Sequence, residues 1–548
     1  MEQLSNKRKV TIMLAIMSAM FFAAINQTIV GTAMPRIIAE LGGMQYYSWV
    51  ITIYLLTSTI ATVMVGKLSD MYGRKPFMLI GIVIFIIGGL LTGFSMDIAQ
   101  LIIYRGVQGI GAGIIMASVF TAVGDLFSPR ERGKWTGILM AVFGFSSMIG
   151  PALGGWIVEH MPWSWLFWIF LPIGIIAFAM ILFLFPKVDQ KSDERIDYAG
   201  SIFLSLTIIA LLTGFSLVGS GDGFTWTSPE IIALFAATVV FLIVFIMVER
   251  KASSPVLPLS LFRNDIVVIS NIISFIINAG MIGALIYIPF FIQGVEGVSP
   301  SQSGYVTMPM SFAMVVVSAL VGRIITKTGK YKRYGIIGLP IMIGGMLVMA
   351  NMSEVWHAVT AMTVFGIGLG LSMPIFTLTV QNAVSPRELG VATSSSQLFR
   401  SVGGTIGIAV LGSIMQSRMM KEMNEQAAAA GGGGALEGMD PKVAEALAPL
   451  QSPEILLNQP ELEKLLHGLP EAVQPIANGI VEMVRTAMAN SLSTVFLVGA
   501  GLVVVAFVLV FFLREIPLRT SNHMPGEEVE EAAERESDKL PSHMEGAH

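Results

Sequence analysis

Four polar side chains lie inside long apolar stretches, where an unpaired polar group is costly. Asn26 and Gln27 interrupt the first apolar run within AAINQTIVGTAMP at 23–35, and Arg105 and Gln108 interrupt a later one. A buried amide without a hydrogen-bond partner costs roughly a few kcal/mol, and a guanidinium in hydrocarbon needs partners or water. Arg105 and Gln108 are three residues apart and therefore share a helix face. These residues are the first candidates for a buried polar site that offers hydrogen bonds.

The composition places these residues in a membrane protein. The 548 residues are 54% hydrophobic and 13% charged, with a mean hydropathy of +0.73, whereas an ordinary soluble chain is about 25% charged. The net charge of −4 gives no sign of nucleic-acid binding. The chain has no cysteine, and its six histidines form no ligand pair at helical spacing, so neither metal nor cofactor is expected. No GxxxxGK[ST] pattern predicts an ATP site.

Apolar runs of about 20 residues predict an all-α membrane protein with fourteen transmembrane helices. The predicted spans are 10–31, 48–66, 76–95, 99–122, 135–158, 165–185, 199–219, 230–248, 266–292, 302–325, 335–352, 358–381, 392–415 and 490–513. If both tails lie on one side, the segments on that side hold 25 of the 33 Lys and Arg residues. Positive charge concentrates in the cytoplasm, so a multi-pass protein with both termini cytoplasmic is predicted.

An internal repeat relates the two ends of the chain. GIGAGIIMASVFTAVGDLFSPRERG at 109–133 matches 366–390 at 11 of 25 positions, at an offset of 257. GKLSDMYGRK at 66–75 matches GRIITKTGKY at 322–331 at an offset of 256. Both matched loops fall on the same predicted side, so the repeat is parallel. It predicts two six-helix halves with a two-helix hairpin inserted between them.

The repeat also sets the expected domain boundaries. Residues 1–197 form the N-terminal half, 198–265 the inserted pair, and 266–513 the C-terminal half. Within the last, 416–489 is expected to be a long outer loop with a flexible start and short surface helices. The acidic segment 514–548 is expected to be a disordered cytoplasmic tail.

The loop GKLSDMYGRK joins the second and third helices on the predicted cytoplasmic side. The predicted gate comprises Gly66, Asp70, Gly73, Arg74, Lys75 and Asp125. The glycines allow a tight turn and close helix approach, and the charges can cluster in one conformation and separate in another. A basic loop that merely obeys the topology rule is the alternative. Thr326 replaces Asp70 in the second half, so the halves are not equivalent here.

GPALGG at 150–155 lies within the fifth predicted helix. Gly150 and Gly154 are four residues apart and share one face, with Gly155 beside them, and this favours close packing. Pro151 removes a backbone donor and bends the helix. The motif therefore predicts a hinge or a tight interface.

These motifs resemble signatures of the major facilitator superfamily. GKLSDMYGRK resembles its loop motif, YRGVQGIGAGI at 104–114 its helix-four motif, and GPALGG the helix-five motif of its exporters. AINQTIVGTAMP resembles the helix-one motif of the fourteen-helix drug:proton antiporter branch. The resemblance spans nearly the whole chain. It implies a monomeric exporter, not an enzyme, in a bacterial cell membrane, with protons, small molecules and the bilayer as partners.

Asn26 departs from the family pattern, which usually has Asp at this position. Asn has the same shape but does not titrate. Three accounts stay open. Coupling could use Arg105, which the resemblance implicates in proton movement, or an acid near a helix end. The transporter could be naturally uncoupled or differently coupled. Asn26 could also be an introduced Asp→Asn change that holds one conformation, which the otherwise intact motif favours slightly.

A substrate site is expected in a central cavity between the halves. Its predicted lining consists of Asn26, Gln27, Gln108, Tyr54, Asn278, Tyr287, Gln293, Tyr305, Met308 and Gln381. The 35 Met and 32 Phe residues offer adaptable apolar surface, which suits lipophilic or amphipathic drugs. The scarcity of buried acids argues against dedicated dicationic substrates.

Other functions fit the sequence less well. An exporter of lipid-like substrates is favoured if 416–489 contacts the membrane. A monovalent cation/proton antiporter would want carboxylates near the membrane centre, and the predicted spans have none there. A membrane enzyme would need convergent catalytic side chains, which the spans lack. A channel fits a two-half repeat with hinge glycines less well than alternating access does.

Overall fold

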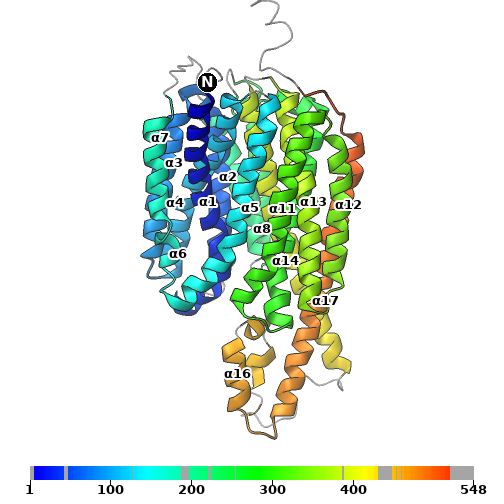
Figure 1. Cartoon of the computed structure of the whole chain (residues 1–548). Helices are drawn as coiled ribbons and strands as arrows, with labels where there is room; N and C mark the ends of the chain where they lie inside the picture. The colour runs from blue at the N-terminus through cyan, green and yellow to red at the C-terminus, as the bar shows by residue number, and fades with distance from the viewer. Residues whose placement is uncertain are drawn as a thin grey trace, which may run out of the picture.

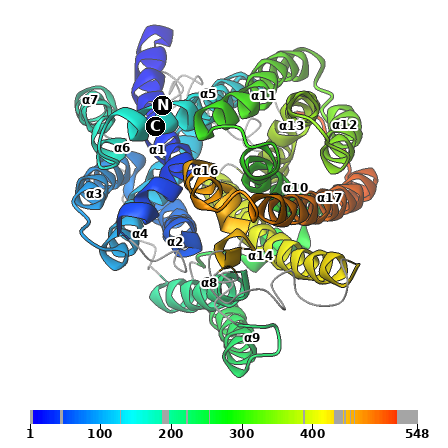
Figure 2. The same ribbon diagram turned by 90° about the horizontal axis from the view of Figure 1, so that it is seen from below.

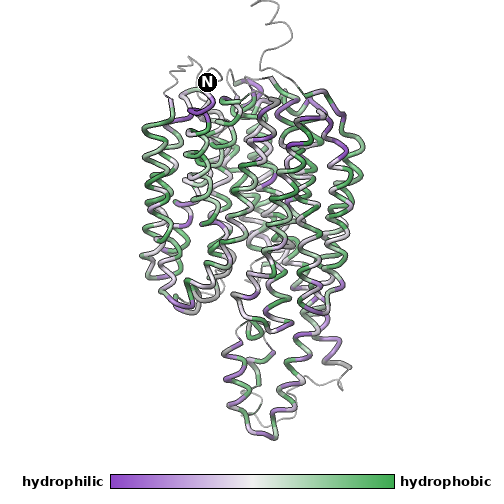
Figure 3. The backbone as a smooth tube through the Cα atoms, in the orientation of Figure 1, coloured by the Kyte–Doolittle hydropathy of each residue, from purple (hydrophilic) through white to green (hydrophobic). Residues whose placement is uncertain are grey.

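A bundle of long helices makes up the protein (Figure 1). The computed structural model describes residues 5–41, 47–127, 129–186, 197–219, 224–252, 255–385, 388–429, 443, 447–451, 453–457 and 459–518. Fourteen helices in this part of the chain are long and apolar enough to cross a membrane, which confirms the predicted number. Hydrocarbon offers no hydrogen bonds, so each crossing segment satisfies its own backbone as a helix. Apolar residues dominate the middle of the bundle (Figure 3).

The N-terminal half contributes six of these spans. Its helices are α1 (Asn6–Leu41), α2 (Tyr47–Tyr72), α3 (Arg74–Gly93), α4 (Ile98–Leu126), α5 (Pro129–His160), α6 (Trp165–Trp168) and α7 (Leu171–Leu184). A short break separates α6 from α7, which together form one span. Pro172 lies in the first turn of α7, where its missing N–H leaves no helical bond unmade. A continuous apolar core runs through this half from Ile12 to Phe185.

The C-terminal half contributes six more spans around its own core, which runs from Ile273 to Leu513. Its helices are α10 (Asp265–Pro289), α11 (Pro300–Thr328), α12 (Lys332–Ala350), α13 (Val355–Ala383), α14 (Leu389–Ala429) and α17 (Gln474–Phe512). A π-helical segment, η3 (Phe290–Val295), continues α10 beyond Pro289. We call the end of the bundle at which α1 begins the upper end, as drawn in Figure 1.

The parallel repeat is visible in the packing of the central helices α4 and α13. A Cβ on Gly111 would lie 2.5 Å from Phe85 N of α3, and one on Gly368 would lie 2.6 Å from Met342 N of α12. The Thr62 hydroxyl of α2 donates to Gly113 O at 3.1 Å, and the Ser318 hydroxyl of α11 donates to Gly370 O at 3.1 Å. Each residue in the first contact and its counterpart in the second half are separated by 256 or 257 positions in the sequence. The two halves therefore use the same backbone-to-backbone contacts, as the repeat predicts.

The inserted pair lies outside the two halves (Figure 2). It consists of α8 (Tyr198–Gly219) and α9 (Pro229–Glu249), followed by the short 3-10 helix η2 (Leu259–Arg263). α8 packs against α2 and α14 through residues such as Leu204, Ile208 and Leu212. In the apolar window of α9 only 17% of the residues are buried, so most of its apolar surface faces outward. Such exposure is stable only against lipid.

The predicted outer loop 416–489 is more structured than expected. α14 continues to Ala429 and α17 begins at Gln474, so both helices project beyond the bundle (Figure 1). Between them lie α16 (Gln459–Gly468) and the 3-10 helices η5 (Ala448–Gln451) and η6 (Pro453–Leu457). Leu447, Leu450, Leu456 and Leu462 are at most 2% exposed. Burial of these leucines holds the projection together, and we call it the lower extension; residues 430–442 of the loop lie outside the described residues.

The predicted tail begins with an ordered segment, contrary to the expected disorder from 514 onward. Residues 513–518 run back over the upper end of the C-terminal half. Glu515 Oε1 accepts from Tyr331 N at 2.7 Å and from Lys332 N at 3.2 Å at the start of α12. The Tyr331 hydroxyl donates to Ile516 O at 3.2 Å and accepts from Ile516 N at 2.9 Å. Burial raises the pKa of Tyr331, so this hydroxyl keeps its proton. Residues 519–548 lie outside the described residues.

The glycine contacts predict a stability difference between two matched substitutions. Gly111→Ala would place a methyl group against the Phe85 backbone, and overpacking of this kind costs about 1–3 kcal/mol. Gly344→Ala is the control, since a Cβ there has nothing within 4 Å, and it should be neutral or stabilising by at most about 1 kcal/mol. Thermal unfolding in detergent measures both. Equal melting temperatures for the two variants would contradict the close approach of α3 and α4.

Candidate functional site

Arg105, Gln108 and Asn26 form a hydrogen-bonded row that links α4 to α1. Arg105 Nη1 donates to Gln108 Oε1 at 2.7 Å, and Gln108 Nε2 donates to Asn26 Oδ1 at 3.4 Å. Asn26 Nδ2 then donates to Phe22 O at 3.1 Å, one turn earlier on α1. Each group donates to the next, so the row runs from the guanidinium to the backbone of α1. The hydrogen bonds bring these three side chains together although α1 and α4 are far apart in the chain; their role in proton coupling stays a prediction.

The guanidinium of Arg105 is held without a counter-charge. Arg105 is 1% exposed, and its Cζ atom lies 4.1 Å from the centre of the Tyr54 ring on α2. Within the described residues, no carboxylate lies at ion-pair distance from it, and its Nε atom has no protein partner. A desolvated cation–π contact stabilises by about 2 kcal/mol. The Tyr54 ring and one amide oxygen therefore carry most of the stabilisation of this charge.

Asn26 is enclosed by the N-terminal half and does not face an open cavity. The residue is 0% exposed, because its amide is directed at Gln108 on α4. Gln27 is partly exposed. Consecutive helix residues point about 100° apart, so the two amides cannot face the same surroundings. The expectation that both line the cavity between the halves is therefore wrong for Asn26.

Four of the other predicted cavity residues have hydrogen bonds within the C-terminal half. Asn278 Nδ2 donates to Ser274 O at 2.9 Å, and the Tyr287 hydroxyl donates to Ile408 O at 3.3 Å. Gln381 Nε2 donates to Thr393 Oγ1 at 3.2 Å, and the backbone oxygen of Gln293 accepts from Gln459 Nε2 at 3.1 Å. Met308 is partly exposed and Tyr305 is 58% exposed. None of these contacts joins the Arg105 row, and a common cavity stays a prediction.

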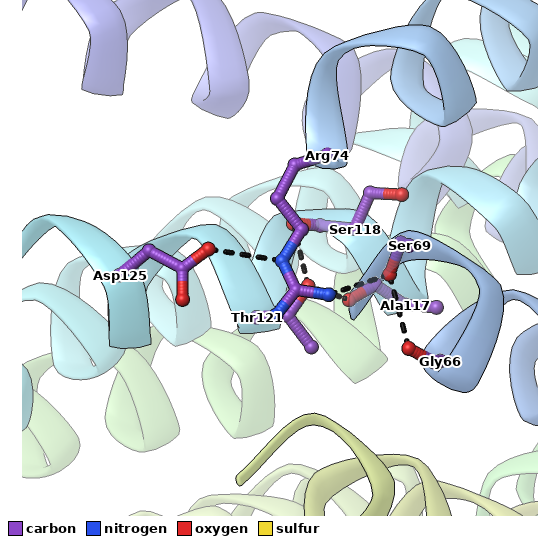
Figure 4. Close-up of polar contacts among 7 residues, drawn as sticks. All are labelled: Gly66, Ser69, Arg74, Ala117, Ser118, Thr121 and Asp125. Carbon is purple, nitrogen blue, oxygen red and sulfur yellow. Dashed lines mark hydrogen bonds and ion pairs between the residues drawn. The ribbon is translucent and has the colours of Figure 1, made fainter. Parts of the chain in front are cut away.

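Three of the predicted gate residues, Gly66, Arg74 and Asp125, lie in one polar cluster at the upper end of the N-terminal half (Figure 4). Arg74 is 7% exposed, and its Nε atom lies 2.9 Å from Asp125 Oδ2 at the end of α4. Arg74 Nη1 donates to Ser69 Oγ at 2.7 Å, and the Ser69 hydroxyl donates to Gly66 O at 3.1 Å. One guanidinium thus ties together the end of α2, the start of α3 and the end of α4. The sequence missed Ser69, although it lies inside the loop motif.

Two neighbours of Arg74 fix its position. Gly73 has φ 87° and ψ 156°, backbone angles that residues other than glycine rarely adopt. This conformation turns the chain from α2 into α3 within one residue. Lys75 Nζ donates to Phe185 O at 2.7 Å, at the carboxyl end of α7, where a cation is favoured by the helix dipole. The side chain of Asp70 lies outside the described residues.

Gly66 lies where the two halves meet at the upper end. A Cβ on Gly66 would clash with the Ser394 hydroxyl and lie 2.8 Å from Ser394 Cβ on α14. Direct contact of α2 with α14 therefore closes the halves against each other at this point. The sequence did not single out Ser394, although the small-residue run TSSS at 393–396 is a signal for close helix approach.

The GPALGG motif lies at another junction between the halves. A Cβ on Gly150 would clash with the Thr28 hydroxyl of α1, and that hydroxyl donates to Ser146 O at 3.2 Å. On the neighbouring turn, a Cβ on Gly304 of α11 would lie 3.4 Å from Ala152 N. Pro151 lies inside α5, and Gly154 and Gly155 are buried. α5 is therefore packed between α1 and α11, which is a suitable place for a hinge.

A second guanidinium, that of Arg400 on α14, was not among the predicted site residues. Its Nη2 atom contacts Met373 Sδ of α13 at 3.8 Å, and its Nε atom has no protein partner. An Arg inside an apolar span is the signal that could have identified it. The bundle therefore holds two arginines without carboxylate partners in the described residues.

Two repeated six-helix halves, an uncompensated buried charge and a contact that closes the halves at one end define the class of the protein. These are features of a polytopic membrane transporter. The model of the Major Facilitator Superfamily matches residues 16–408. The chain belongs to this family, whose members are transporters and not enzymes.

Two relatives from Bacillus subtilis match along nearly their entire length. The chain is 36% identical over 543 residues to "Multidrug transporter protein MdtP" of Bacillus subtilis, covering 98% of each chain. It is 32% identical over 518 residues to "Multidrug resistance protein 3" of the same species, covering 94% of this chain and 96% of the relative.

Solved structures agree with the fold. The human organic anion transporter TETRAN superposes with a TM-score of 0.58 at 13% identity, covering 92% of this chain and 99% of the other. A bacterial homologue of the human lysosomal transporter Spinster gives a TM-score of 0.56 at 16% identity, covering 94% of this chain and 100% of the other.

The Arg105 contact predicts different results from two substitutions of Tyr54. Tyr54→Phe keeps the aromatic face beneath the guanidinium and should leave stability nearly unchanged. Tyr54→Leu removes that face and should lower the free energy of unfolding by about 1–2 kcal/mol. Thermal unfolding of the two variants measures the difference. Equal losses in both would show that the ring face does not stabilise Arg105.

The Arg74 cluster predicts a looser upper end when its acid is neutralised. Asp125→Asn removes the ion pair, which is worth about 1–2 kcal/mol at this partly exposed position. A Ser394→Cys probe between the halves should then react faster with a maleimide, and the chain has no native cysteine to interfere. Asp97→Asn at the lower end is the control, because Asn also caps a helix well. Unchanged labelling in Asp125→Asn would contradict a gate role.

Proposed function

We propose that the protein is a secondary exporter that moves lipophilic or amphipathic drugs out of the cell by alternating access. The observation that carries this proposal is the full-length similarity to the multidrug transporter MdtP, which covers 98% of both chains. The packing supports it, because α2 meets α14 and α5 meets α11 across the two halves. Contacts of this kind, made through glycines and hydroxyls, can separate without leaving a buried charge unpaired.

The proposed orientation places the upper end in the cytoplasm. Both the Arg74 cluster and the segment 513–518 lie there, and most Lys and Arg residues fall in segments at that end. The protein is proposed to act as a monomer in a bacterial cell membrane. In this orientation the Gly66–Ser394 contact closes the cytoplasmic side, and the lower extension stands outside the cell.

The proposed substrates are neutral or anionic rather than dicationic. Arg105 and Arg400 are buried without carboxylate partners in the described residues. The described membrane spans carry their acids near the ends, for example Asp125, Glu159 and Glu249. A dication would have to leave water without a counter-charge, which is costly in an apolar bundle. The same distribution of acids argues against a monovalent cation/proton antiporter.

The lower extension does not favour a lipid substrate. Leu447, Leu450, Leu456 and Leu462 are buried, and the described large apolar side chains that it exposes are few, namely Met420 and Ile476. A segment that inserts into lipid would present a continuous apolar face. We therefore regard the extension as an external body and keep drug export as the proposed function.

Proton antiport is part of this proposal, and position 26 is where it is in doubt. Asn26 closes a row that begins at Arg105, so an Asp here would accept the same bond from Gln108 and also titrate. The amide preserves the structure of the row but carries no proton. Coupling in the present chain must use another group, or transport proceeds down the substrate gradient alone.

Dye efflux from proteoliposomes tests this proposal. We expect the present chain to equilibrate a lipophilic anionic dye, and Asn26→Asp to respond to an imposed pH gradient several-fold more strongly. Asn351→Asp, at an exposed site at the lower end of α12, is the control. Equal responses of the parent and Asn26→Asp would show that coupling bypasses position 26. Failure of both to move any dye would contradict export itself.

A further inference from the structure

Two carboxylates meet at the upper end of the inserted helix pair. Asp197 immediately precedes α8, and Glu249 is the last residue of α9. A Cβ on Gly200 would clash with Asp197 Oδ2 and lie 2.7 Å from Glu249 Oε2. Both oxygens therefore approach the same point above Gly200, where the absence of a side chain leaves room for them.

Neither of the facing oxygens has a hydrogen-bond partner, although each carboxylate is anchored through its other oxygen. Asp197 Oδ1 accepts from Gly200 N at 2.7 Å, and Glu249 Oε1 accepts from Leu257 N at 2.6 Å. Asp197 Oδ2 and Glu249 Oε2 are buried and unpartnered. Glu249 as a whole is only 4% exposed. Two buried anionic oxygens held side by side repel each other strongly unless something lies between them.

No neighbouring cation relieves this repulsion among the described residues. The titratable side chains on adjoining elements are Tyr72, Tyr198, Arg250, Lys251, Arg263 and Asp265, all exposed, and Glu388, which accepts from Ser385 Oγ at 3.0 Å. Within the same part of the chain, no group of three or more metal-ligating side chains is present. A proton is the smallest species that satisfies both oxygens at once.

The helix ends determine which acid holds the proton. Asp197 lies at the amino end of α8, where the helix dipole and the Gly200 N–H favour the anion. Glu249 lies at the carboxyl end of α9, where the dipole disfavours a negative charge. The neutral acid should therefore be Glu249, with its hydroxyl donating to the Asp197 carboxylate.

We propose that Asp197 and Glu249 form a proton-binding site at the upper end of the inserted pair. One proton from the adjoining water binds Glu249 Oε2, the new O–H donates to Asp197 Oδ2, and the charge of the pair changes from −2 to −1. The site lies apart from the Arg105 row, and it does not depend on the proposed direction of transport.

The proton also affects how the inserted pair is joined to the rest of the bundle. The Leu257 N–H bonded to Glu249 belongs to the linker that follows α9. Val256 and Leu257 are buried in a cluster that includes Val63 of α2 and Leu389 of α14. Loss of the proton restores repulsion between the start of α8 and the end of α9. This repulsion therefore weakens the packing of the linker against α2 and α14, the two helices that meet between the halves.

Infrared difference spectroscopy of the purified full-length protein in nanodiscs tests the site without any substrate. The parent should show the C=O stretch of a protonated carboxyl group at neutral pH, and this band should disappear as the pH is raised. Glu249→Gln should lack the band. Gln can still accept from Leu257 N and donate to Asp197 Oδ2, so this variant should fold. The melting temperature of the parent should fall as the pH is raised and the proton is lost, whereas that of Glu249→Gln should not fall over the same pH range.

Glu230→Gln is the matched control, since Glu230 lies at the other end of α9 and is exposed. It should retain both the band and the pH-dependent melting of the parent. Identical titrations of the parent and Glu249→Gln would overturn the proposal. So would a band that is lost in Glu230→Gln and retained in Glu249→Gln. Dye transport is not measured here, so the outcome is independent of the test of export.

Discussion

The close approach of helix backbones at glycine is the constraint on which the bundle depends. Lipid does not drive helices together as water does, so they associate through tight contact and hydrogen bonding. α4 and α13 each present a row of glycines, represented by Gly111 and Gly368, to the helices on both sides. Because these central helices are fixed so closely, the side chains they carry are also fixed. Arg105 and Asp125 are both placed by the packing of α4.

The two halves have the same helix packing, but different polar contacts stabilise their upper ends. In the N-terminal half Arg74 bonds to Asp125. At the equivalent place in the C-terminal half, Asn382 replaces the acid and donates to Pro517 O at 3.1 Å. There Glu515 caps the start of α12, so the segment 513–518 takes the position of the ion pair. One half is joined by an ion pair between helices, the other by a docked peptide. The two halves are therefore stabilised by different contacts at equivalent positions of their upper ends.

The sequence predicted most of the fold because its signals are local or repeated. Apolar runs predicted the number of spans, and the 257-residue offset predicted the parallel halves. The grouping of Arg105 with Gln108 follows from helical spacing. The burial of Asn26 did not follow, because the direction of a side chain around α1 depends on which helix packs against it. The extension of α14 and α17 was missed because polar helical residues beyond the membrane carry no apolar signal.

The 41-residue helix α14 and the 39-residue helix α17 both run unbroken from the membrane region into the lower extension. A body attached in this way turns with the half that bears it, and its tip sweeps a longer arc than any point inside the lipid belt. Most of a transporter this size is hidden by detergent or nanodisc in projection images. The lower extension projects beyond the bundle and reports the tilt of the C-terminal half. Particles in electron micrographs can therefore be sorted by conformation without an added antibody fragment.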